Sequence, residues 1–163
     1  MLVPIVAFSV FFILIIFIIK SSNKNRENQY ETLIESLKTE TELYVEQTKS
    51  VTMTIGLNNR DFLFNRCDLY LTKNAIVILG FTKDSFLKQL SLPIILTAEL
   101  SEFSNRFPFA YVKKTNKISF ENNIVKIIFG EKGITKTEVV LKLNSLNENE
   151  KNKIKQIAEK IYC

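Results

Sequence analysis

The segment from Leu2 to Ile19 constrains this chain most, because it contains no charged side chain and a single hydroxyl group, that of Ser9. As an α-helix this segment would extend about 27 Å at ~1.5 Å per residue, close to the ~30 Å hydrocarbon core of a bilayer. No second stretch of the sequence is apolar over a comparable length. We therefore predict a transmembrane anchor over residues 1–20 that crosses the bilayer once.

The charges beside the apolar segment predict its orientation. Lys20, Lys24 and Arg26 follow the segment, whereas no charged side chain precedes it. Since cations beside a span stay on the cytoplasmic side, we expect a single-pass membrane protein whose carboxyl-terminal domain is cytoplasmic. The alternative is a secretory signal, which would leave an exported domain after cleavage. The sequence lacks the basic residues before the apolar segment and the small residues at a cleavage site that are typical of such signals.

Residues 21–49 are expected to connect the anchor to a globular domain. A polar tether comes first, and apolar residues at helical spacing then predict an amphipathic helix from about Gln29 to Val45. This helix either packs on its own domain or supports self-association, because its apolar stripe is too short to specify a coiled coil alone. The stripe consists of Tyr30, Leu33, Ile34, Leu37 and Tyr44.

From Val51 onward the apolar residues recur every second position, which indicates β-strands. Lys73-Asn74 and Asn122-Asn123 separate consecutive strand-like segments, as the turns of tight hairpins do, and asparagine tolerates the positive φ that such turns need. The pattern returns to helical spacing in the last segment, at Ile154, Ile157, Ala158 and Ile161. We predict one domain over residues 50–163, with seven or eight antiparallel strands and a closing helix.

This order of elements resembles the pleckstrin-homology-like (PH-like) superfamily, and most closely its bacterial and GRAM-type members. The resemblance lies in RCDLYLTKNAIVILGF, from Arg66 to Phe81, and in the segment from Asn123 to Ile161, which looks like the last two strands and the closing helix. It implies an α+β fold in which a half-open antiparallel β-barrel is capped by a carboxyl-terminal α-helix. Members of the superfamily bind lipids, peptides or proteins. The spaced Lys and Arg residues of inositol-lipid binders are absent around Asn58 to Arg66.

Composition argues against several classes of function. The sequence has no histidine, no phosphate-binding loop and no dinucleotide fingerprint, so we predict no enzymatic activity, no catalytic residue and no cofactor. Its two cysteines, Cys67 and Cys163, lack the spacing of a metal site, and we predict no metal. The net charge of +5 comes without clustered arginine, and we predict no binding of nucleic acid.

Two groups of residues are candidates for binding. Phe103, Arg106 and Phe107 form an aromatic segment that would either grip a protein partner or close the core, since aromatic residues and arginine are enriched at the centres of interfaces.

Lys113, Lys114 and Lys117 are the densest basic group, which would either contact an anionic lipid surface or be solvated. We therefore expect a membrane-anchored, non-catalytic PH-like adaptor at the inner face of the membrane, with an unidentified protein partner. The alternative function is a module that senses anionic lipid.

Overall fold

The computed structural model describes the chain except at residues 1, 57–58, 84–87, 132, 134–135 and 163, and it describes no side chains for residues 2–10, 12–14 and 59–60. In chain order the elements are α1 (Leu2–Leu37), β1 (Thr41–Ile55), the 3-10 helix η1 (Asn59–Phe62), β2 (Arg66–Thr72), β3 (Ala75–Phe81), β4 (Ile94–Thr97), α2 (Leu100–Arg106), β5 (Tyr111–Lys113), β6 (Thr115–Glu121), β7 (Ile124–Gly130), β8 (Glu138–Asn144) and α3 (Glu148–Tyr162).

The eight strands form one sheet in the order β5-β4-β3-β2-β1-β8-β7-β6, which curls into a nearly closed barrel. All neighbouring strands are antiparallel except β4 and β5, which run parallel. The two edge strands, β5 and β6, are consecutive in the chain and are separated only by Lys114. The two edges of the sheet are therefore joined by the chain connection at Lys114, and not by hydrogen bonds between β5 and β6.

Strand β1 belongs to both halves of the barrel. Its first part pairs with β2 from Thr41 to Lys49, and its second part pairs with β8 from Lys49 to Ile55. A β-bulge lies within the first part, between Val45 and Thr48, with Gln47 at φ 47°. The Gln47 backbone N–H donates a hydrogen bond of 2.7 Å to Asp68 Oδ1, which fixes the bulge to β2. Burial raises the pKa of Asp68 above its ordinary value.

The interior of the barrel is an apolar cluster that the closing helix completes. Ile154, Ile157 and Ile161 of α3 are fully buried in this cluster, and α3 contacts β1, β2 and β3. The start of α3 is a capping box, in which the Glu150 N–H donates to Asn147 Oδ1 at 2.9 Å and the Asn147 N–H donates to Glu150 Oε2 at 2.8 Å. The predicted closing helix is thus confirmed.

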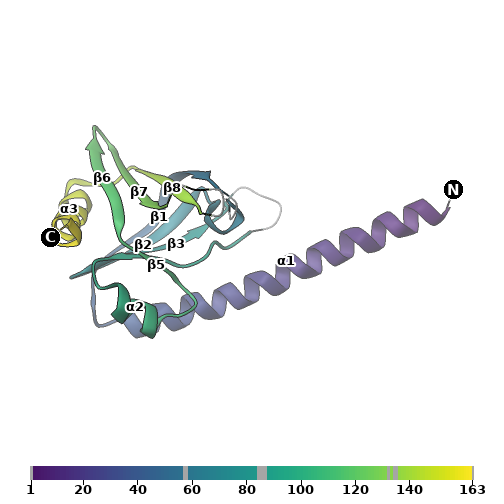
Figure 1. Cartoon of the computed structure of the whole chain (residues 1–163). Helices are drawn as coiled ribbons and strands as arrows, with labels where there is room; N and C mark the ends of the chain where they lie inside the picture. The colour runs from purple at the N-terminus through teal and green to yellow at the C-terminus, as the bar shows by residue number, and fades with distance from the viewer. Residues whose placement is uncertain (1, 57–58, 84–87, 132, 134–135, 163) are drawn as a thin grey trace.

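A second apolar cluster lies on the outside of the barrel. It joins Tyr30, Leu33 and Leu37 of α1 to the outward-facing residues of β3 and β4, and to Phe103 and Phe107. Figure 1 shows the second half of α1 and the short helix α2 lying beside this part of the sheet, while the first half of α1 extends away from the barrel. Residues 75–80 of β3 are consequently buried on both faces of the sheet.

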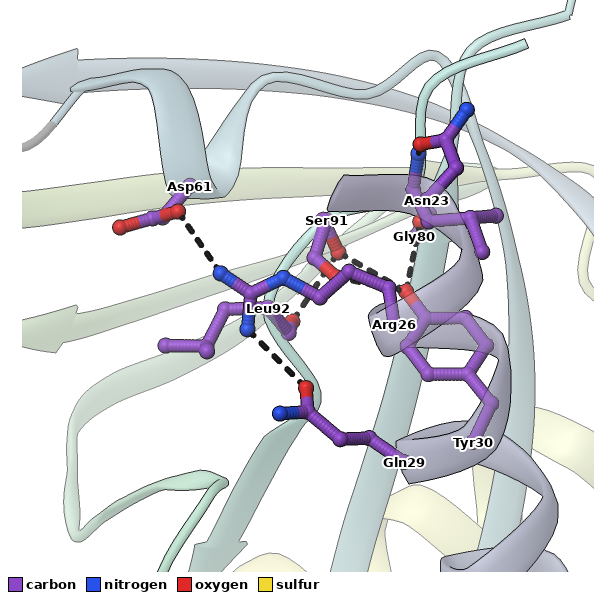
Figure 2. A network of polar contacts seen from close by, with 9 residues as sticks. Asn23, Arg26, Gln29, Tyr30, Asp61, Gly80, Ser91 and Leu92 are labelled. Atoms are coloured by element: carbon purple, nitrogen blue, oxygen red, sulfur yellow. Dashed lines mark hydrogen bonds and ion pairs between the residues drawn. The ribbon is translucent and has the colours of Figure 1, made fainter. Parts of the chain in front are cut away.

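Polar contacts fix α1 to the barrel, as Figure 2 shows. The Tyr30 hydroxyl lies 2.8 Å from the carbonyl oxygen of Gly80 and 3.0 Å from that of Ser91, and it donates to these acceptors. Arg26 reaches Asp61 at 3.1 Å, and Asn23 Oδ1 accepts the Leu90 N–H at 3.1 Å. Burial raises the pKa of Tyr30, so the phenol remains neutral and able to donate.

Within the part of the chain whose side chains are described, no helix combines the length and the apolar character that crossing a membrane requires. This finding contradicts the predicted transmembrane anchor over residues 1–20, and with it the single-pass membrane localisation with a cytoplasmic domain.

The arrangement of the first 55 residues differs from the expected anchor, tether and connector in a second way. One continuous helix, α1, runs from Leu2 past residue 20 to Leu37. Residues 41–55 form β1, although residues 41–45 were expected to be helical. The helix ends because the Leu37 carbonyl accepts bonds from the Glu40 N–H and the Thr41 hydroxyl, both at 2.9 Å. Of the two expectations for the amphipathic stripe, packing on the chain's own domain is the one that the buried Tyr30, Leu33 and Leu37 match.

Candidate functional site

One outer surface of the barrel is uncovered within the described part of the chain. It is the outside of the sheet formed by the second part of β1 together with β8, β7 and β6, and we call it the open face. On β1, the side chains of Val51, Met53 and Ile55 are 50%, 57% and 61% exposed. Aliphatic side chains at three successive outward positions of one strand are unusual on a surface that contacts only water.

Strand register places further apolar residues beside these three. Val140 of β8 lies opposite Met53, and Ile128 of β7 lies opposite Val140. Their neighbours in sequence, Val139, Leu141, Ile127 and Phe129, are fully buried inside the barrel, so Val140 and Ile128 point outward. The open face therefore has an apolar row that crosses three strands, with Met53, Val140 and Ile128 side by side.

The bulge in β1 explains why apolar residues point outward here. Before the bulge, Val45 points into the barrel, whereas after it the inward positions are held by Thr48 and Ser50, both buried. Because side chains alternate along a strand, the extra residue exchanges the two faces and sends Val51, Met53 and Ile55 outward. Among the described residues, the buried Thr48 hydroxyl has no hydrogen-bond partner. The register thus places hydroxyls in the core and aliphatic side chains in solvent.

The charge of the open face is mainly positive. Lys142 of β8 lies directly opposite Lys126 of β7, in the row beside Val140 and Ile128. Like charges at directly opposite positions of a sheet repel each other and destabilise it. Lys117 lies opposite Ile128, and Lys49 lies at the other end of the face. None of these four lysines has an ion-pair partner among the residues that the structure describes. The acidic residues at the margins are Glu121 and Glu138.

An alternative site is a pocket of about 330 Å³ near the junction of β5 with β6. The ring of Tyr111 packs at its floor against Phe62, with ring centroids 5.0 Å apart. Its charged groups are already matched: Asp61 pairs with Arg26, and Glu131 pairs with Lys113 at 3.6 Å and also with Lys136. The adjacent lysines lower the pKa of Glu131, Lys136 more than Lys113, while burial and then Glu131 raise the pKa of Tyr111. These charged groups of the pocket are therefore already paired with other residues of the chain.

The predicted aromatic segment is part of the core. Phe103 and Phe107 are 4% and 2% exposed, and they pack under α1 in the outer apolar cluster. Arg106 donates hydrogen bonds to Ser36, pairs with Glu40 at 2.7 Å and stacks over the ring of Phe107. Of the two expectations for this segment, closing the core is the one that these contacts match. Phe103, Arg106 and Phe107 thus lie against α1 of the same chain.

The predicted basic group is divided among different surroundings. Lys113 pairs with Glu131 at the mouth of the barrel, Lys114 is the exposed link between β5 and β6, and Lys117 lies on the open face. Only Lys117 therefore contributes to the candidate surface described above.

The three cations expected to set membrane orientation also differ from one another. Lys20 and Lys24 are exposed on α1, whereas Arg26 is partly buried and holds α1 on η1 through Asp61. Cys67 lies within the barrel, where burial raises the pKa of its thiol to about 12. This thiol is consequently protonated and unreactive at neutral pH.

The open face was not predicted from the sequence. A signal for it exists: Val51, Met53 and Ile55 alternate with Ser50, Thr52 and Thr54, so whichever set faces the core, the other faces out. Hydrophobic patterning alone assigns the aliphatic set to the core, and the bulge that reverses this assignment has no marker such as glycine.

Comparisons with protein-family models, with curated proteins and with solved structures give no match to this chain. The candidate surface is therefore argued from its own geometry and charge.

Proposed function

We propose that this chain is a non-catalytic protein-interaction module, and that the open face is its binding surface. The observation that carries the proposal is the register of β1 after its bulge, which buries Thr48 and Ser50 while Val51, Met53 and Ile55 point outward. A sequence that breaks the usual burial pattern at one place commonly does so at a functional site. A partner that covers these side chains would recover roughly half of the about 1.5–3 kcal/mol that burial of a fully exposed aliphatic side chain contributes, since each is already about half buried.

The fold supports an adaptor of the PH-like type. Its nearly closed eight-stranded barrel and the closing helix in the barrel core are similar to the half-open barrel and carboxyl-terminal helix that the resemblance implies. Fold alone does not select a ligand, because one scaffold can bind proteins or lipids. The choice between them rests on the open face.

A protein partner fits the open face better than an anionic lipid surface does. Its apolar residues lie in the middle of a sheet and not at the tip of a loop. The surrounding backbone would therefore prevent them from entering a bilayer. Its four lysines are at the lower limit of the roughly 4–8 basic residues that recognise anionic membranes, and two glutamates border them. An apolar row with charges around it is the usual composition of a protein interface.

Site-specific photocrosslinking of the full chain in living cells tests the proposal. A photoreactive amino acid replaces Met53 or Val140 on the open face, and Glu159, exposed on α3, provides the matched control position. We expect a discrete adduct of protein size from positions 53 and 140 and none from position 159. Adducts of lipid mass would favour the lipid-sensing alternative, and the absence of any adduct from the open face would contradict the proposal.

A further inference from the structure

The facing lysines of the open face indicate the chemistry of the partner. Lys126 and Lys142 lie directly opposite each other, and the described residues provide no carboxylate between them. Repulsion between them is removed when an anionic group lies over both ammonium groups. Resting on the function proposed above, we infer that the open face binds an acidic amphipathic α-helix of a partner protein.

A helix is favoured over an extended segment because of the hydrogen bonds of the sheet. The apolar row lies over β8 and β7, which are paired on both sides, and over the second part of β1, which pairs with β8. Because the backbone groups of a sheet point towards neighbouring strands and not out of its face, an extended peptide laid across these strands would find none to pair with. A helix satisfies its own backbone groups internally and can present side chains alone.

The dimensions of the apolar row suit a helix that crosses the strands. Neighbouring strands lie ~4.8 Å apart and the pitch of an α-helix is ~5.4 Å, so residues one turn apart can lie over successive strands. A stripe at positions i, i+4 and i+7 would then contact Met53, Val140 and Ile128 in turn. The parallel row that contains Lys142 and Lys126 runs beside this stripe, where carboxylates on the flank of the helix would reach it.

The chain itself shows this form of packing on the opposite face. There, Tyr30, Leu33 and Leu37 of α1 cover β3 and β4, while Glu31 and Glu35 on other sides of α1 are exposed. A second copy bound symmetrically, face against face, is disfavoured because it would bring Lys126 and Lys142 against the same lysines. Charge complementarity therefore selects an acidic helix from a different protein.

Two synthetic peptides of equal length test the inference with the full chain. Both carry leucine at i, i+4 and i+7 of a helix, and the remaining positions are glutamate-rich in one and lysine-rich in the other. Fluorescence anisotropy is expected to show that the glutamate peptide binds at least about tenfold more tightly, a difference of ~1.4 kcal/mol. Equal binding of the two peptides would overturn the inference.

Variants of the open face locate the binding. K126E/K142E is expected to weaken the glutamate peptide about tenfold or more and to favour the lysine peptide, whereas M53S/V140S weakens both. K24E/K155E is the matched control, since it makes the same change in net charge at exposed positions on α1 and α3. Equal effects of K126E/K142E and K24E/K155E would overturn the inference, because the attraction would then be non-specific.

Two further measurements separate the other possible occupants. Binding of phosphatidylserine vesicles that competes with the glutamate peptide and is lost in K126E/K142E would assign the face to lipid. Light scattering that shows a dimer lost in M53S/V140S would assign it to a second copy. Either result overturns the inference. Protein adducts from position 53 in cells, without binding of the glutamate peptide, would overturn the acidic helix but leave the interaction function intact.

Discussion

The two outer faces of this barrel are built from the same kind of strand but differ in what covers them. Over β3 and β4, the chain provides α1 and α2, and the strand beneath them, AIVILGF, is apolar at almost every position. Over β8 and β7, no helix lies among the described residues, and the strands alternate between buried and half-exposed residues. The comparison shows that a strand buried on both faces can be recognised from a continuous apolar run, whereas an uncovered binding face looks like an ordinary surface strand.

The largest expected difference between the two faces is the cost of a buried charge. Leu33→Asp would place a carboxylate between α1 and the sheet, and should cost several kcal/mol of unfolding free energy, because Leu33 is fully buried. Val51→Asp on the open face should change stability by less than about 0.5 kcal/mol, since Val51 is half exposed and lies opposite Lys142. Urea unfolding of the two full-chain variants measures both values. Equal losses would show that the open face is packed against another part of the chain.

A smaller difference is expected from filling space at glycine. A methyl group at Gly80 of β3 would lie 2.4 Å from ring carbons of Phe64, so Gly80→Ala should cost about 1–3 kcal/mol through overpacking. Gly133, between β7 and β8, is the matched control, because its nearest neighbour would lie 3.4 Å away. Thermal unfolding should separate the two variants clearly. If Gly80→Ala matched Gly133→Ala in stability, the strand below α1 would be less tightly packed than these distances indicate.

Tyr30→Phe tests the polar attachment of α1 at the level of one hydroxyl. Loss of the Tyr30 hydroxyl should lower the free energy of unfolding by about 1 kcal/mol, since the hydrogen bond to the buried carbonyls of Gly80 and Ser91 is removed. Hydrogen exchange should quicken in residues 23–37 and remain unchanged in β8. Tyr162→Phe, on the exposed side of α3, is the control and should have no effect. Faster exchange throughout the barrel would mean that α1 and the barrel unfold as one unit.

The same hydroxyl predicts a dependence on alkaline pH. Burial raises the pKa of Tyr30 in the folded chain, so the neutral phenol is favoured by folding. This contribution to stability is fully present below pH ~10, the pKa of an unfolded tyrosine, and is lost as the pH rises from there towards the folded pKa. The stability of Tyr30→Phe should fall less than that of the unsubstituted chain over this range. Identical dependences of stability on alkaline pH in the two proteins would show that Tyr30 ionises as freely in the folded chain as in the unfolded chain.

The smallest expected effect concerns the ion pair at the same attachment. A double-mutant cycle with R26Q and D61N should give a coupling of about 0.2–1 kcal/mol, because the Asp61 side chain is about half exposed and solvent screens the pair. The pair between Glu148 and Lys151 on α3 offers a comparison in which no helix is being held to the sheet. The coupling should decrease with added salt. A coupling that is large and independent of salt would indicate that α1 shields the pair from water.

The sequence predicted those parts of the fold that local chemistry determines. The hairpin at Lys73-Asn74 joins β2 to β3 as expected, and Asn122 has the positive φ, 49°, that the tight turn between β6 and β7 requires. The closing helix, with its four apolar positions, is buried as its spacing indicated.

Longer-range packing determined the parts that the sequence did not predict. Residues 41–45 extend the apolar spacing of α1, yet they become strand, because the sheet offers a partner on β2 to each of them except Glu42. The aromatic residues of α2 are recognisable as an apolar group, but only the position of α1 decides that they are covered. The open face depends on one bulge, at which Gln47 bonds to Asp68, a residue distant in sequence. Reading residues by local pattern cannot detect such a contact.

The shared strand β1 also sets the order in which the barrel can assemble. Its first part pairs with β2, which follows a short distance along the chain. Val51 and its neighbours can pair only with β8, which is synthesised after almost the whole of the β region. Until then, the second part of β1 has an unpaired edge and aliphatic side chains in water, a combination that favours mispairing with other chains. A nascent chain of this kind folds slowly through its most distant strand pair. The surface proposed here for recognition is, during synthesis, the surface in most need of protection.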